Sequence, residues 1–159
     1  MILQERWLMI KLAKIISTFF GIGLFPVGPG TLASLTVVLA YKFFLYRLAW
    51  PYYLLLLILM IAAGTFTSTI YARALNLKDP GKIVIDEVAG QLSAVFVLRP
   101  DWSLLAASFI LFRIFDIIKP LGVKKLENLP WGWGIMADDL ASGLAVNIIV
   151  HVVVIIFKI

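Results

Sequence analysis

Residues 51–75 form an almost unbroken apolar stretch, and this stretch restricts the chain to folds that need lipid. It carries a single charge, Arg73, near its end. A helix of this length extends about 37 Å, and the hydrocarbon core of a bilayer is about 30 Å thick. Overall, 62% of the residues are hydrophobic and 14% are charged. A soluble core could not cover so much apolar surface, so the sequence predicts an integral membrane protein.

Five apolar segments predict an all-α bundle of about five transmembrane helices in a single domain, residues 1–159. The predicted spans are residues 31–48, 51–75, 83–98, 102–118 and 134–157. An amphipathic helix over residues 7–20, with Lys11 and Lys14 on one face, is expected to precede them and to lie in the membrane interface. These two lysines interrupt the apolar run and no small-residue cleavage site follows, so we expect no removable signal peptide.

The distribution of cationic residues predicts which side of the bundle faces the cytoplasm. If the spans alternate, the loops 21–30, 76–82 and 119–133 lie on one side together with the amphipathic helix. That side holds nine cationic residues: Arg6, Lys11, Lys14, Arg73, Lys78, Lys82, Lys119, Lys124 and Lys125. The other side holds four: Lys42, Arg47, Arg99 and Lys158. The positive-inside rule therefore places the three loops in the cytoplasm and the C-terminus outside.

More than half of the acidic side chains stand at helix ends on this same predicted side. Five of the nine are placed there: Asp86, Glu87, Asp116, Asp138 and Asp139. An ionised carboxylate at membrane depth is costly unless it is paired or bound to a metal, and five clustered anions repel one another. A divalent cation removes both problems, and hard oxygen ligands suit Mg²⁺. These five residues are therefore the candidate metal ligands, and Mg²⁺ is the expected cofactor.

Helix polarity separates one of these acids from the others. Four are predicted in first helical turns, where the positive end of the helix dipole favours anions. Asp116 is predicted near a C-terminal end and needs a partner, which Arg113, Lys119 or a metal can supply. The alternative is that the acidic turns only cap helices and that Arg113 and Asp116 form a structural ion pair. That alternative accounts for single residues better than for all five together.

The loop 21–30 is rich in glycine and proline and leads into a predicted helix start at Thr31. Thr31 is a good N-cap, and free backbone N–H groups at such a turn suit a phosphate. Lys82 is expected to neutralise phosphate oxygens, and Lys124 to touch anionic headgroups. The candidate substrate-binding residues are Pro29, Gly30, Thr31, Ser34, Lys82 and Lys124. The alternative is that the turn only redirects the chain and that the lysines only set topology.

Several reaction classes are excluded by residues that the sequence lacks. It has no cysteine and a single histidine, His151, about 18 Å along the last helix from Asp139. Cysteine-based phosphatases and a two-histidine phosphotransfer mechanism are thus excluded. If the protein is a phosphatase, metal-activated water is the most economical route, and a serine or aspartate nucleophile has no support. The net charge of +5 is assigned to lipid headgroups and topology rather than to nucleic acid.

Three segments, taken in order, resemble the phosphatidylglycerophosphatase A family. They are GIGLFPVGPGTLASL (21–35), DPGKIVIDEVAGQ (79–91) and FRIFDIIKPLGVKKLENLPWGWGIMADDLASG (112–143). The resemblance implies a multi-pass phosphatase of the bacterial inner membrane whose active site faces the cytoplasm. Its substrate would be phosphatidylglycerophosphate in the bilayer, and Mg²⁺-dependent loss of the terminal phosphate would give phosphatidylglycerol.

The resemblance also implies roles for individual residues. By position, it assigns catalytic or binding roles to Asp86, Glu87, Arg113, Asp116, Lys119, Pro120, Asp138, Asp139, Pro29, Gly30 and Thr31. The carboxylates would hold one or two Mg²⁺, and Arg113 and Lys119 would stabilise charge on the phosphoryl oxygens. The sequence departs from the family at Ala33, at Leu121-Gly122 and at Pro130-Trp131-Gly132. None of these departures removes a charged residue, so they bear on loop geometry and substrate fit.

Two other functions compete with a lipid phosphatase. A small cation transporter or channel also uses intramembrane carboxylates, but it predicts acids deep within the spans and polar residues along a route across. Here the acids stay at one face, and residues 140–157 offer only Ser142, Asn147 and His151. The third possibility is a catalytically inactive assembly factor, against which the intact acidic motifs argue. An enzyme at the membrane interface is therefore the favoured interpretation.

Overall fold

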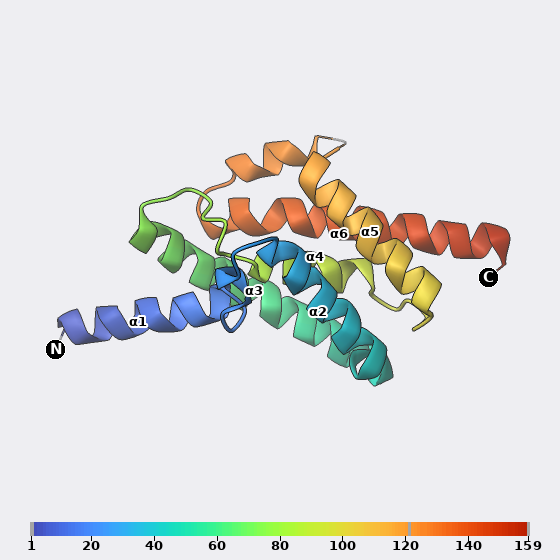
Figure 1. Ribbon diagram of the computed structural model, residues 1–159, viewed down its shortest axis with the longest axis horizontal. Helices are drawn as coiled ribbons and strands as arrows, with labels where there is room; N and C mark the ends of the chain where they lie inside the picture. The colour runs from blue at the N-terminus through green and yellow to red at the C-terminus, as the bar shows by residue number, and fades with distance from the viewer. Residues whose placement is uncertain (1, 121, 159) are drawn as a thin grey trace.

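The protein is all-α throughout the part of the chain that the structure describes, which confirms the all-α part of the predicted fold class. The computed structural model describes residues 2–120 and 122–158, so the departure at Leu121 lies outside the described residues. The α-helices are α1 (Ile2–Ser17), α2 (Pro29–Phe43), α3 (Trp50–Leu75), α4 (Ile85–Ala94), α5 (Trp102–Ile118) and α6 (Gly132–Phe157). Three short 3₁₀ helices join them: η1 (Ile22–Leu24), η2 (Leu45–Arg47) and η3 (Val123–Asn128). Figure 1 shows α4 in the middle of the assembly and the two termini at opposite ends.

Two of the helices are long and apolar enough to cross a membrane. α3 and α6 have 26 residues each, with mean hydropathies of 2.0 and 2.5 over their most apolar windows. α2 and α5 are shorter, at 15 and 17 residues. α4 has 10 residues, which is about 15 Å and half of the hydrocarbon core. Helix length and composition thus support two crossings, and the count of five stays a prediction.

The predicted start of α2 is wrong by two residues. The helix begins at Pro29, and Thr31 is therefore inside it rather than at the N-cap. The N-cap is Gly28, whose backbone is left-handed with φ 59°. Glycine adopts this conformation at little cost, and the fixed φ of proline suits the first helical position.

The position of the second pair of acids also differs from the prediction. α6 begins at Gly132, so Asp138 and Asp139 lie in its second turn and its first turn holds no acid. Asp86 and Glu87 do lie in the first turn of α4, as predicted. The helix dipole therefore favours the anionic forms of the α4 pair more than those of the α6 pair, because its effect falls off within the first turn.

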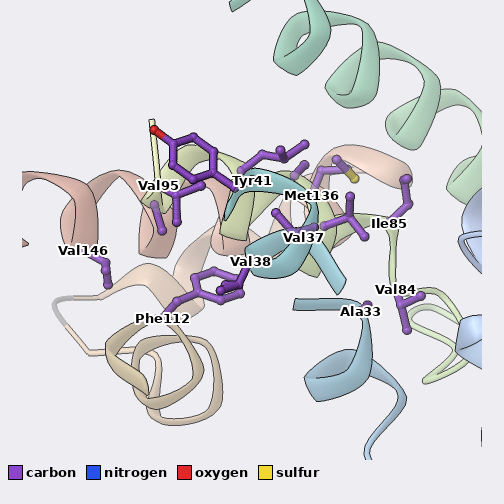
Figure 2. Packing of buried hydrophobic residues seen from close by; sticks show 14 of the residues in the cluster. Ala33, Val37, Val38, Tyr41, Val84, Ile85, Val95, Phe112, Met136 and Val146 are labelled. Atoms are coloured by element: carbon purple, nitrogen blue, oxygen red, sulfur yellow. The ribbon is translucent and has the colours of Figure 1, made fainter. Parts of the chain in front are cut away.

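The short helix α4 is the centre of the hydrophobic core. Nine of its ten residues are buried, and it packs against α2, α3, α5 and α6. Figure 2 shows buried side chains packed together in this core, among them Val37 of α2, Phe112 of α5 and Met136 of α6. Because α4 holds Asp86 and Glu87, the core fixes the position of two predicted metal ligands.

Side chains of the longer helices donate hydrogen bonds to backbone carbonyl groups of α4 where this helix ends inside the bundle. The last four carbonyl groups of a helix have no helical partner, and an apolar surrounding supplies none. Asn147 donates from Nδ2 to the carbonyl oxygens of Ala94, at 3.1 Å, and Phe96, at 2.9 Å. The hydroxyl of Tyr53 donates to the carbonyl oxygen of Leu92 at 2.9 Å. These hydrogen bonds stabilise α4 within the bundle although it is only about half as long as the hydrocarbon core is thick.

Glycines let the backbones of α4 and α6 touch. A Cβ atom on Gly143 would lie 2.1 Å from the carbonyl oxygen of Gly90. A Cβ atom on Gly90 would lie 2.6 Å from the ring of Phe112 and 2.7 Å from the carbonyl oxygen of Asp139. Small residues commonly permit such close approach between membrane helices. This contact brings the acidic turns of the two helices together.

Replacing Gly143 by alanine tests this contact. Gly143→Ala is expected to lower the free energy of unfolding by about 1–3 kcal/mol, because the added methyl group meets backbone and forces the helices apart. The matched control is Gly81→Ala, because a Cβ at Gly81 meets nothing within 4 Å. Unfolding in detergent micelles would be followed by circular dichroism. Equal stability of the two variants would contradict a backbone contact at Gly143.

Candidate metal centre and active site

Three of the five predicted metal ligands converge between α4 and α6. Asp86, Glu87 and Asp139 each offer a carboxylate oxygen, and these oxygens lie within 4.8 Å of one another. Asp86 is 8% exposed and Asp139 is 3% exposed. One oxygen of each residue is buried without a hydrogen-bond partner: Asp86 Oδ1, Glu87 Oε2 and Asp139 Oδ2. Buried anions without donors are costly, so this three-carboxylate cluster fits a hard divalent cation.

The start of α2 lies against the three-carboxylate cluster. A Cβ atom on Gly30 would lie 1.8 Å from Oε1 of Glu87, so only glycine leaves room for that carboxylate. Ser34 donates from Oγ to the carbonyl oxygen of Gly30 at 3.0 Å and accepts from Nη1 of Arg113 at 3.5 Å. No side chain caps α2, so the N–H groups of Gly30 and Thr31 lack helical partners beside the cluster.

Arg113 links α5 to the three-carboxylate cluster. Its Nη1 lies 2.6 Å from Oδ2 of Asp116 and 3.9 Å from Oε1 of Glu87. Arg113 is thus the partner that Asp116 was expected to need at the C-terminal end of its helix. Asp116 is also close enough to Glu87 and Asp139 to repel both. The Nε atom of Arg113 is buried and has no hydrogen-bond partner, which leaves one donor for an additional acceptor.

Lys119 pairs with Asp138, which is not one of the three clustered carboxylates. The lysine caps the C-terminal end of α5 in a left-handed conformation with φ 51°. Its Nζ forms an ion pair with Asp138 and lies 2.7 Å from Oε1 of Glu127. Partial burial lowers the pKa of Lys119, but the hydrogen bonds to these two carboxylates outweigh it and raise the pKa above its ordinary value. The lysine is therefore cationic at every physiological pH.

Sequence reasoning missed two acids that border the site. Glu127 pairs with Lys119, and this hydrogen bond lowers the pKa of Glu127. Asp79 lies near Lys119, Asp138 and Glu127; loss of surrounding water raises the pKa of Asp79, and the charge of Lys119 only partly offsets that rise. Both residues lie inside the segments that resemble a known family. Their position in these segments could have marked them as candidates, although no role was assigned to them.

A cavity of about 440 Å³ opens beside these two acids, and Asp79 and Glu127 both line it. Its other walls include Arg73, Trp131 and Ile135. Because Glu127 binds Lys119 and Lys119 binds Asp138, the cavity borders this chain of ion pairs.

The remaining predicted substrate-binding residues surround the site at different depths. Gly30 and Ser34 are buried and Pro29 is half-buried. Thr31, Lys82 and Lys124 are exposed. Their roles stay predictions, because exposure makes them accessible but does not show a ligand.

Comparison with known proteins places the chain among lipid phosphatases. The model of the family described as phosphatidylglycerophosphatase A matches residues 15–154. A phosphatidylglycerophosphatase A of Escherichia coli is 35% identical over 127 residues, which cover 79% of this chain and 73% of that protein. The Haemophilus influenzae phosphatidylglycerophosphatase A is 32% identical over 139 residues, covering 84% and 83%.

A third relative carries a different substrate in its name. A Bacteroides thetaiotaomicron protein, provisionally named a phosphatidylinositol-3-phosphatase, is 35% identical over 149 residues, covering 89% of this chain and 92% of that protein. No solved structure gives a significant match. The relatives thus share a lipid phosphate as the named substrate and differ in its headgroup.

Metal binding tests the three-carboxylate cluster directly. Asp139→Asn is expected to weaken binding of Mn²⁺, used as a paramagnetic probe, by at least about tenfold, since it removes one charged ligand. Glu5→Gln is the control, because Glu5 is an exposed acid of α1. Free Mn²⁺ would be measured by electron paramagnetic resonance in detergent. Equal affinity in the two variants would exclude Asp139 as a ligand.

Proposed function

The chain belongs to the phosphatidylglycerophosphatase A family, and we propose that it hydrolyses the terminal phosphate of phosphatidylglycerophosphate to give phosphatidylglycerol. The reaction class is phosphoric monoester hydrolysis, and the cofactor is Mg²⁺. The observation that carries the proposal is the three-carboxylate cluster, whose buried oxygens lack partners. It lies beside the uncapped start of α2, which offers donors to a phosphate.

Asp86, Glu87 and Asp139 would hold the metal. Mg²⁺ bound there would offset the charge of the phosphate and lower the pKa of the attacking water. Asp116 and Asp138, the other two predicted ligands, are held by Arg113 and Lys119. They would act through water or by orienting their neighbours.

Two groups of donors would bind the phosphate. The N–H groups of Gly30 and Thr31 point from a helix start, where both the free donors and the helix dipole favour an anion. The unpartnered Nε of Arg113 lies next to the three-carboxylate cluster and would stabilise negative charge that develops on the phosphoryl oxygens. Lys119 would contribute mainly by fixing Asp138, because its ammonium group already binds two carboxylates.

A cation transporter or channel is the weaker alternative. Such a protein needs polar side chains that remain available along a route across the membrane. Asn147, the first polar residue after Ser142 on α6, instead binds the carbonyl oxygens that end α4. Nδ1 of His151 lies 2.9 Å from the backbone oxygen of Asn147. Asn147 and His151, the polar residues of α6 beyond Ser142, thus hydrogen-bond to backbone, which favours the enzyme.

The protein would sit in the bacterial inner membrane, cross it several times and present the site to the cytoplasm. Exposed apolar side chains cover α3, α5 and α6: Leu55, Ile58, Leu59, Phe66, Ile110, Ile114, Ile117, Leu144, Ile148 and Ile155. Contact with lipid is the natural environment for such surfaces. Lys82 and Lys124 are exposed on the proposed cytoplasmic side, where they would meet anionic headgroups.

Phosphate release from phosphatidylglycerophosphate in detergent micelles tests the activity. Release is expected to require Mg²⁺ and to stop with EDTA. Asp86→Asn and Asp139→Asn are expected to lower kcat by at least about a hundredfold, as for loss of a group that stabilises transition-state charge, while both proteins stay folded. Glu5→Gln should behave like the unchanged protein. Near-normal turnover in both aspartate variants would defeat the assignment.

Single cysteines test the proposed orientation, because the chain has none of its own. Lys82 and Arg99 lie on opposite predicted sides and both are exposed. In intact cells freed of the outer membrane, a membrane-impermeant maleimide is expected to label Arg99→Cys, and to label Lys82→Cys only after permeabilisation. The reverse pattern would place the site on the outer face.

A further inference from the structure

An apolar groove runs along the lipid-facing side of α3, next to the start of α6. Its volume is about 690 Å³, and its lining is almost entirely apolar. The α3 wall includes Ile58, Ala62, Phe66 and Arg73, and the other wall is formed by Trp131 and Trp133. Both tryptophans are more than half exposed. A groove of this composition suits a hydrocarbon chain.

A cation stands at one end of this groove. The guanidinium of Arg73 lies 3.6 Å from the ring centroid of Trp131, which leaves its edge available for hydrogen bonds. Among the ion pairs in the described part of the chain, none involves Arg73. Arg6 of α1 and Arg73 also line a smaller cavity between α1 and α3. The groove therefore ends in positive charge that complements an anionic headgroup.

The groove adjoins the cavity beside the candidate site. Arg73 and Trp131 line both spaces. The cavity of about 440 Å³ is also lined by Lys78, Asp79 and Glu127. Glu127 binds Lys119 at the edge of the site. An apolar groove, a cation and a cavity of mixed polarity thus lie next to one another, and the cavity borders the Glu127–Lys119 pair.

We infer that this groove binds the lipid substrate: one acyl chain lies along α3, and Arg73 binds the phosphodiester that joins the headgroup to the lipid. The inference rests on the proposed function and adds the place where the substrate enters. The headgroup then occupies the cavity of about 440 Å³. Phosphatidylglycerophosphate and a phosphatidylinositol phosphate both contain this phosphodiester, so Arg73 is a positioning residue that serves either headgroup.

Kinetics on two substrates test the inference. The first is diacyl phosphatidylglycerophosphate in mixed micelles, and the second is its deacylated, water-soluble counterpart. Arg73→Gln is expected to raise KM for both by about tenfold, since one charge-assisted contact to the phosphodiester is lost, with kcat changed by less than about twofold. Arg73→Lys should recover part of the affinity, because it keeps the charge and loses the planar fork.

Ala62→Trp tests the chain-binding part, because the indole would fill the groove. The preference for the diacyl over the deacylated substrate, as a ratio of kcat/KM, is expected to fall by about tenfold, as if about two methylene groups lost their contact. Leu59→Trp is the matched control, because Leu59 is an exposed residue of α3 outside the groove. Arg99→Gln is the control for loss of one exposed cation. Thermal unfolding of each variant would confirm that it folds.

The outcomes separate the inference from the proposed function. If Arg73→Gln and Ala62→Trp match their controls while Asp139→Asn is inactive, the inference is wrong and the phosphatase stands. A fall in kcat at unchanged KM in Arg73→Gln would also overturn it, because the residue would then act in the reaction step. If the unchanged protein releases no phosphate from either substrate, the proposed function fails and the inference fails with it.

Discussion

The site depends on the backbone of a short helix that ends inside the bundle. α4 can stop after ten residues only because its carbonyl groups find donors there. Asn147 and Tyr53 supply some of these hydrogen bonds, and the hydroxyl of Tyr41 donates to the carbonyl oxygen of Leu98 at 2.5 Å just beyond the helix. These bonds fix the C-terminal end of α4, and with it the position of the helix that carries Asp86 and Glu87.

Glycine then sets how closely the carboxylates approach one another. Gly90 and Gly143 allow α4 and α6 to touch, and Gly30 leaves room for Glu87. A methyl group at any of these positions would meet backbone, an aromatic ring or the carboxylate itself. Packing therefore keeps the three carboxylates close together although they repel one another. A bound cation would offset this repulsion. A fold with larger residues there would separate the acids and weaken metal binding.

The sequence predicted those features that depend on the local pattern of apolar and charged residues. It did not predict features that depend on backbone conformation or on contacts between distant segments. α3 and α5 follow from apolar runs. The N-cap of α5 was not assigned from the sequence: it is Asp101, whose side chain accepts from the N–H of Ser103 at 2.9 Å. The identity of the three clustered carboxylates was within the predicted five. The start of α2 was missed because Gly28 takes a left-handed conformation, which residue type alone does not require. The pairing of Lys119 with Glu127 was missed because it depends on how the loop after α5 folds back.

The five acids divide into two groups, and this division bears on how an anion can bind. Asp116 and Asp138 are compensated by Arg113 and Lys119. Among the described residues, the ion pairs of the three clustered carboxylates are limited to the 3.9 Å contact between Glu87 and Arg113. If all three are ionised, one Mg²⁺ leaves a single net negative charge, which repels a phosphate dianion. The phosphate therefore needs further stabilisation, from a second divalent cation or from hydrogen-bond donors such as the unpartnered Nε of Arg113. The charge of Arg113 already offsets that of Asp116, so Nε would contribute a directed hydrogen bond rather than an additional charge.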